Sequence, residues 1–163
     1  MCALSKLHLN MAFYTSKNEY LSKVYFLIMI TKKMKELIVK TLLEQYPGLV
    51  TIYLFGSMAQ ENLVPRADLD LAILPRKPLD SFKTWKIAQD LSILLHYEVD
   101  LIDLLKASTV MRVQVISKGI CLYEGNKIER EKFEDHVYSA YARLNEERKE
   151  IIEDIKKKGK VYG

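Results

Sequence analysis

The stretch LFGSMAQENLVPRADLDLAIL, residues 54–74, decides how this chain is interpreted. An apolar run ends at Gly56-Ser57, ten residues follow, and Asp68 and Asp70 then stand two positions apart inside a second apolar run. Aspartate is depleted in β-strands, so these two residues need a reason to be there. Because side chains alternate along a strand, both carboxylates are expected on the same face.

Carboxylates held close together repel each other, and a divalent cation between them removes the repulsion. Mg²⁺ prefers carboxylate oxygens together with substrate phosphates. Gly56 lets the backbone approach a ligand closely, and the turn that follows, with the Ser57 hydroxyl, offers donors to a phosphate. These features predict a site that moves a nucleotide or phosphoryl group with metal help. A solvated strand edge beside an ordinary Gly-Ser turn is the structural alternative.

A third carboxylate would complete a site for two metal ions. The sequence EVDLIDL, residues 98–104, offers Asp100 and Asp103. Residues three apart on a strand face opposite sides, so only one of these aspartates can join Asp68 and Asp70. The pattern alone does not choose between them.

The whole pattern predicts an α+β fold, an α/β mixture with one layer of mostly buried strands. Asp80 or Ser81 is expected to cap one helix, Ser108 another, and Trp85 is expected in the core. Apolar runs predict strands, and 3.6-residue periodicity predicts helices. The strands are expected over residues 49–55, 68–74, 98–104 and 120–125, and the helices over residues 31–46, 81–95, 108–119 and 126–158.

The last helix carries an apolar stripe with a period near 3.5 residues on a heavily charged background. We expect its first half to pack on the sheet and its second half to contact a helical partner. The stripe consists of Phe133, Val137, Tyr141, Leu144, Ile151 and Ile155, with Arg148 at the missing step.

Composition and charge exclude several classes of protein. The chain has 163 residues, of which 49% are hydrophobic, as in an ordinary globular domain. Its net charge of +4 lies within residues 1–33, because residues 34–163 carry equal numbers of basic and acidic side chains. A nucleic-acid-binding face is therefore not supported. Cys2 and Cys121 form no metal or disulfide pattern, which fits a cytoplasmic protein.

The domain prediction has three parts. Residues 1–30 are expected to be an extension outside the fold. If the natural start codon lies farther downstream, these residues are not part of the natural protein. The apolar run VYFLIMI, residues 24–30, is far too short to span a bilayer. Residues 31–125 are expected to form the catalytic domain, and residues 126–163 a C-terminal helix for packing and partner contact.

The residues quoted above resemble a known family. GSMAQENLVPRADLD, residues 56–70, is similar to the signature of the DNA polymerase β-type nucleotidyltransferase superfamily in its minimal form. The resemblance is strongest to the MntA-type adenylyltransferase antitoxins of HEPN/MNT toxin–antitoxin systems. VDLIDL, residues 99–104, resembles the strand that carries the family's third aspartate, which selects Asp100 over Asp103. Residues 107–125 and 141–155 also resemble this group.

The resemblance implies a polymerase β-like fold, with a small mixed sheet flanked by helices and a long C-terminal helix. It also implies transfer of AMP from ATP to a tyrosine of a HEPN RNase toxin, in a hetero-oligomeric complex and with two Mg²⁺ ions. If the family's site residues are transferred to the matching positions of this sequence, Gly56 and Ser57 hold the triphosphate, and Asp68 and Asp70 bind both metals. Asp100 binds the catalytic metal and helps to deprotonate the attacking hydroxyl.

The chain departs from the family at two places. MAQEN, residues 58–62, replaces a small or basic continuation, and Ala67 stands where serine is frequent. These departures favour one alternative, an antitoxin that blocks its toxin by binding alone. A second alternative is transfer of a nucleotide to a small-molecule hydroxyl.

Overall fold

The computed structural model describes residues 32–59 and 68–158, and the chain divides into two units, Met1–Glu36 and Leu37–Gly163. The proposed extension over residues 1–30 lies outside the described residues, as does Ala67. Residues 32–45 form a helix that ends before Pro47-Gly48, as predicted. No helix within the described ranges is long and apolar enough to cross a membrane.

A mixed sheet of four strands is the centre of the second unit. The strands lie in the order β3-β2-β1-β4. β2 and β3 are parallel, whereas β1 is antiparallel to both β2 and β4. The predicted fold class is confirmed, and each predicted strand is found with slightly shorter ends. The bounds are β1 Thr51–Phe55, β2 Leu69–Leu74, β3 Val99–Asp103 and β4 Ile120–Glu124.

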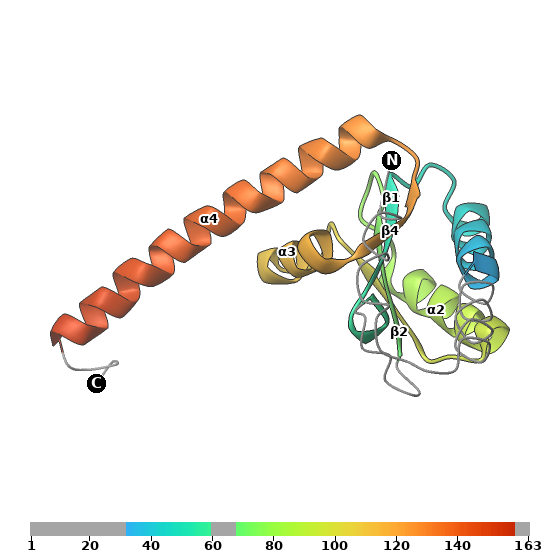
Figure 1. Cartoon of the computed structure of the whole chain (residues 1–163), viewed down its shortest axis with the longest axis horizontal. Helices are drawn as coiled ribbons and strands as arrows, with labels where there is room; N and C mark the ends of the chain where they lie inside the picture. Colours follow the sequence, from blue (N-terminus) through green and yellow to red (C-terminus); the bar gives the residue numbers. More distant parts are fainter. Residues whose placement is uncertain (1–31, 60–67, 159–163) are drawn as a thin grey trace, which may run out of the picture. The chain divides into compact units, whose positions relative to one another are not determined.

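Helices cover both faces of this sheet. α2 (Ser81–Leu95) and α3 (Thr109–Lys118) lie on opposite sides of the strands (Figure 1). On the α3 side, Tyr53, Phe55, Ala72 and Leu74 share one core cluster with Val115 of α3. Alternation therefore places every second residue of β1 and β2 on the face that α3 covers.

The helix ends follow the capping residues of the sequence. The Asp80 side chain accepts a hydrogen bond from the Lys83 N–H at 2.8 Å, and Ser108 accepts one from the Met111 N–H at 3.2 Å. Such side chains satisfy donors that the first helical turn leaves free. Of the two predicted candidates Asp80 and Ser81, Asp80 caps α2, and the predicted cap Ser108 of α3 is confirmed. α4 (Lys127–Lys158) begins after Asn126, whose side-chain oxygen accepts from the backbone N–H of Glu129.

The prediction that Trp85 lies in the core is wrong. Trp85 is 58% exposed and Phe82 is 70% exposed, with their ring centroids 5.9 Å apart. The buried residues of α2 are Thr84, Ile87, Ala88 and Leu91. At 3.6 residues per turn Trp85 lies about 100° around the helix from Thr84, which takes it away from the sheet.

The first half of α4 packs on the body of the unit, as predicted. Val137 is fully buried, and Phe133 packs against the core cluster on the α3 side of the sheet. Farther along the helix, Ile151 and Ile152 are 56% and 52% exposed. The sequence pattern thus continues beyond the part of the helix that the body covers.

Candidate active site

Asp70 and Asp100 stand side by side on neighbouring strands. β2 and β3 run parallel with Asp70 in register with Asp100. Register partners on adjacent strands direct their side chains to the same face. Asp70 alternates with Ala72 and Leu74, which belong to the core cluster under α3. Both carboxylates therefore lie on the face of the sheet that α3 partly covers, and Asp68, two residues before Asp70, is exposed beside them.

Gly56 brings the strand-to-turn corner directly against Asp70. β1 pairs with β2 so that Phe55 is in register with Asp70, and Gly56 follows with φ +68°. A Cβ atom at this position would lie 1.8 Å from Asp70 Oδ2, so no side chain fits there. The positive φ independently favours glycine. Ser57–Ala59 then form a short 3-10 turn, in which the Ala59 N–H donates to the Gly56 carbonyl oxygen.

The charges of the three aspartates act on one another. Burial, and then the negative charges of Asp100 and Asp68, raise the pKa of Asp70 above its ordinary value. Among the described residues, no lysine or arginine forms an ion pair with any of the three. An approaching cation would therefore meet a concentrated negative charge from three neighbouring aspartates.

The aspartates are neighbours, but their oxygens do not form a finished coordination shell. Within residues 32–59 and 68–158, no group of three or more His, Cys, Asp and Glu side chains is arranged so that it could hold a metal ion. The donor chemistry nevertheless fits a hard divalent cation, because carboxylate oxygens are its preferred ligands. Burial is the main cause of the raised pKa of Asp70, and a cation would relieve the additional repulsion from Asp100 and Asp68.

Asp103 has a different environment from Asp100, although both lie on β3. Asp103 is 7% exposed, and its carboxylate accepts hydrogen bonds from the Leu79 N–H at 2.9 Å and the Leu105 N–H at 2.8 Å. It therefore ties two loops to the end of β3. The structure brings Asp100, and not Asp103, next to Asp70.

The sequence did not reveal the contact between Gly56 and Asp70, because it depends on the register of two strands. It also did not reveal how Asp103 is used. A buried aspartate that is followed two residues later by a loop N–H is a recognisable Asx-type pattern, and this signal was present in DLL, residues 103–105.

Fold and site together define a nucleotidyltransferase, and comparison with known proteins places the chain within that class. The family model "Polymerase beta, Nucleotidyltransferase" matches residues 38–128. The curated protein adenylyltransferase MntA of Shewanella oneidensis is 40% identical over 118 residues, which cover 72% of this chain and 84% of the relative. The chain therefore belongs to the polymerase β nucleotidyltransferase family and, within it, to the MntA-type protein adenylyltransferases.

Solved structures agree with this assignment. A crystal structure of a toxin–antitoxin with AMP-PNP matches with a TM-score of 0.68 and 39% identity, covering 74% of this chain and 97% of that one. A tri-AMPylated Shewanella oneidensis HEPN toxin in complex with MNT antitoxin matches with a TM-score of 0.65 and 37% identity, covering 76% and 97%.

Proposed function

We propose that this chain is an antitoxin that transfers AMP from ATP to a tyrosine hydroxyl of a HEPN-domain toxin in the cytoplasm, in a reaction that requires Mg²⁺. The observation that carries the proposal is the in-register pair Asp70 and Asp100, with Gly56 directly against Asp70. The similar proteins, a protein adenylyltransferase and an antitoxin in complex with an AMPylated HEPN toxin, support the proposed acceptor and nucleotide.

Each residue has a distinct part in the proposed reaction. Gly56 and Ser57 hold the triphosphate close to the carboxylates, since Gly56 leaves no side chain between backbone and ligand. Asp68, Asp70 and Asp100 would hold Mg²⁺, which supplies charge stabilisation at the phosphates when bound. Asp100 accepts the proton of the tyrosine hydroxyl. The tyrosine oxygen then forms a bond to the α-phosphorus, the bond to the bridging oxygen breaks, and pyrophosphate leaves.

A binding-only antitoxin is the second candidate. Its support is the MAQEN segment, of which the structure describes Met58 and Ala59 as part of the short turn. Transfer to a small-molecule hydroxyl is a third candidate, and it has less support because the similar curated protein is a protein adenylyltransferase.

Intact-mass spectrometry of the toxin tests the proposal. The toxin is incubated with this protein, ATP and Mg²⁺, and Asp68→Asn/Asp70→Asn runs as the matched variant. Asparagine keeps the shape and removes the charge, so the variant should remain folded and lose at least about 10²-fold in rate. Each transfer adds the mass of one AMP unit to the toxin.

The outcomes separate the three candidates. A mass gain that the double variant does not produce supports protein adenylylation at this site. No gain, with a stable toxin complex, supports the binding-only antitoxin. A gain that the double variant retains would place the active site elsewhere in the chain.

A further inference from the structure

We propose that the C-terminal half of α4 docks an amphipathic helix of the acceptor protein, with a carboxylate of that helix facing Arg148. The docking surface, here called the α4 stripe, consists of Leu144, Arg148, Ile151 and Ile155. This inference rests on the proposed function for the identity of the acceptor, although binding can be measured without any AMP transfer.

The α4 stripe continues the face by which α4 packs on its own unit. Val137 on that face is 1% exposed. At 100° per residue, all four stripe residues lie within about 40° of the direction of Val137. The stripe therefore points to the same side of the helix as the residue that the body buries.

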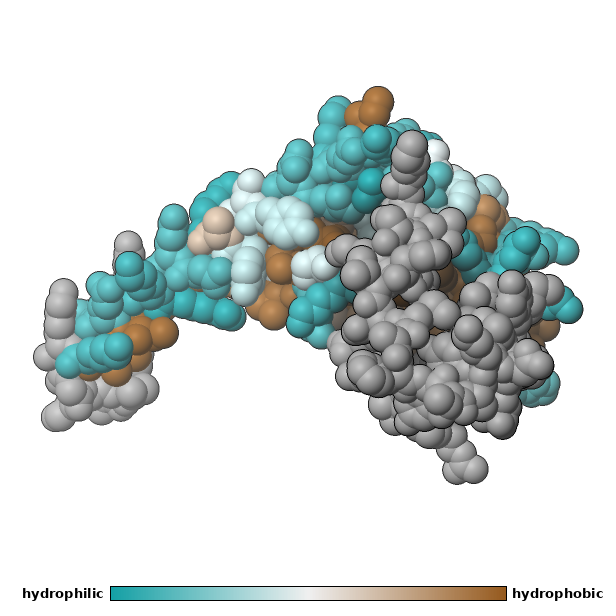
Figure 2. All heavy atoms as spheres, viewed as in Figure 1, coloured by the Kyte–Doolittle hydropathy of each residue, from teal (hydrophilic) through white to brown (hydrophobic). Residues whose placement is uncertain are grey.

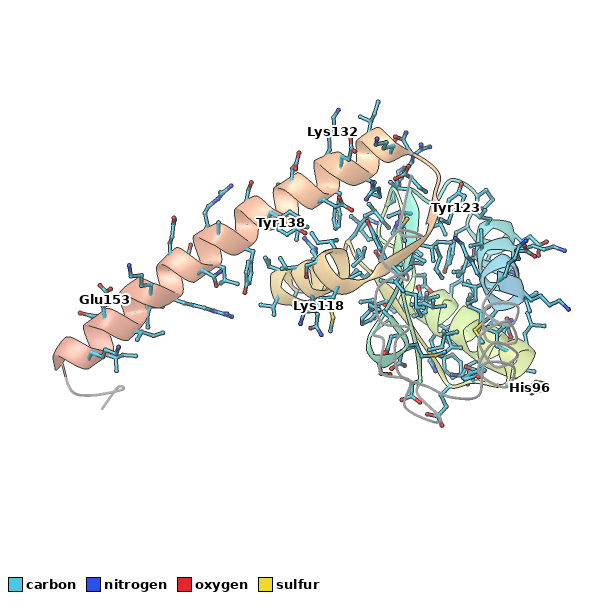
Figure 3. All side chains as sticks on the ribbon, in the orientation of Figure 1. His96, Lys118, Tyr123, Lys132, Tyr138 and Glu153 are labelled. Carbon is cyan, nitrogen blue, oxygen red and sulfur yellow. The ribbon has the colours of Figure 1, made fainter. Side chains whose placement is uncertain are left out.

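Within the described residues, Arg148 and Ile151 of the stripe are exposed, whereas Leu144 and Ile155 are half-buried. From residue 145 to residue 156, the side chains that the structure describes are exposed, apart from Ile155, which is half-buried. In Figure 3, Tyr138 lies where α4 passes α3, whereas Glu153 lies on the part of the helix that continues beyond it. Figure 2 shows hydrophobic residues near this end of α4 among hydrophilic ones. Exposed isoleucines on an otherwise charged helix are typical of a partner interface.

The α4 stripe lies on the side of the sheet that carries the candidate active site. Asp70 shares its face with Ala72 and Leu74, in the cluster to which α3 and Phe133 of α4 contribute. A protein held against the stripe would therefore approach the sheet from the α3 side, where the carboxylates are. That approach is what transfer to a protein hydroxyl requires.

Arg148 argues against a second copy of this chain as the occupant. The repeat of 3.5 residues gives Arg148 a central position between Leu144 and Ile151. A parallel pair of identical helices would place two Arg148 side chains opposite each other. Glu147 borders one edge of the stripe, and an antiparallel pair centred on Arg148 would bring the two copies of Glu147 together. Either arrangement is repulsive, whereas a different helix with an acidic residue at the centre is complementary.

The test compares exposed isoleucines on the same helix. Ile151→Asp introduces a charge into the stripe. Ile128→Asp is the matched control, because Ile128 is 66% exposed and lies about 180° from the direction of Val137. Arg148→Glu is tested beside Arg143→Glu, an exposed arginine off the stripe. The dissociation constant for the toxin is measured by calorimetry, with ATP omitted.

We expect Ile151→Asp and Arg148→Glu to weaken toxin binding at least about tenfold, as for a central interface residue. Both controls should stay within about twofold of the unmodified chain. Under turnover, Ile151→Asp should raise the KM for the toxin and leave the KM for ATP unchanged.

Several results would overturn the docking proposal. Equal dissociation constants for Ile151→Asp and Ile128→Asp would show that the stripe does not bind the toxin. Sedimentation of the chain alone as a dimer that Ile151→Asp dissociates would make a second copy the occupant. Failure of the proposed function looks different: the unmodified chain would bind the toxin through Ile151 and transfer no AMP.

Discussion

At the scale of the residue, two glycines with positive φ allow the effect of backbone strain to be measured separately from the effect of contact with Asp70. Gly48 has φ +89°, and a Cβ there would meet only Arg76 Nη1 at 3.9 Å, whereas a Cβ on Gly56 would collide with Asp70. Gly48→Ala should lower the free energy of unfolding by about 1–2 kcal/mol and leave AMP transfer intact. Gly56→Ala should cost more stability and abolish transfer, because Asp70 must move.

Urea unfolding and the toxin mass assay measure both effects. Equal losses of activity in the two variants would mean that strain, and not the contact with Asp70, makes Gly56 necessary.

Substitutions of the two aspartates of β3 are expected to have opposite effects on stability and on AMP transfer. Asp103→Asn removes one acceptor from a buried carboxylate that binds the N–H groups of Leu79 and Leu105, so the free energy of unfolding should fall by about 1–3 kcal/mol. AMP transfer by the folded fraction should persist. Asp100→Asn changes an exposed side chain, so stability should hold while transfer is lost.

Thermal melts and the rate of AMP addition check this pair. The assignment of Asp100 to the site would be wrong if its asparagine variant transferred AMP at the normal rate.

At the scale of the element, a partly buried hydrogen bond between Tyr53 and Glu134 attaches α4 to the sheet. The Tyr53 hydroxyl of β1 donates a hydrogen bond to Glu134 Oε1 at 2.5 Å, and Arg130 Nη1 lies 2.7 Å from the same oxygen. Burial, followed by the hydrogen bond to Glu134, raises the pKa of Tyr53, so the hydroxyl keeps its proton and remains a donor at neutral pH.

Tyr53→Phe should therefore lower the free energy of unfolding by about 1–2 kcal/mol, since a hydrogen bond to a charged group is lost. Glu134 keeps its pairing with Arg130, which limits the loss. Tyr138→Phe is the control, because Tyr138 is 46% exposed. Chemical denaturation of both variants is the measurement, and equal midpoints would show that the contact contributes nothing to attaching α4.

The elements were predictable where a local signal defines them. Asp80 and Ser108 are caps that bond within their own first turn, so sequence alone located the starts of α2 and α3. Trp85 was misplaced because α2 is apolar around much of its circumference, and composition does not say which arc meets the sheet.

The site was predictable in part for the same reason. Alternation placed Asp68 and Asp70 on one face from sequence alone. The choice of Asp100 over Asp103 depends on which face of β3 meets the core, and the contact of Gly56 with Asp70 depends on the pairing of β1 with β2. Both are long-range relations between strands, which local patterns do not encode.

At the largest scale, the unit Leu37–Gly163 combines a sheet and its covering helices with the long helix α4, whose second half is mostly exposed. The candidate site lies on the α3 side of the sheet, and α4 contributes Phe133 and Val137 to the core. Beyond Leu144 the helix adds almost no buried surface, so most stability is expected to lie upstream of that residue.

Ending the chain after Leu144 should therefore leave folding nearly unchanged, with a melting temperature within about 2 °C of the full chain. The truncated protein keeps Asp68, Asp70 and Asp100, so its kcat at saturating toxin should be retained. It lacks Arg148, Ile151 and Ile155, so its KM for the toxin should rise at least about tenfold. Calorimetric melts and initial rates over a range of toxin concentrations measure both quantities. A large drop in melting temperature would show that the C-terminal half of α4 stabilises the fold itself, and an unchanged KM would show that the acceptor is held elsewhere.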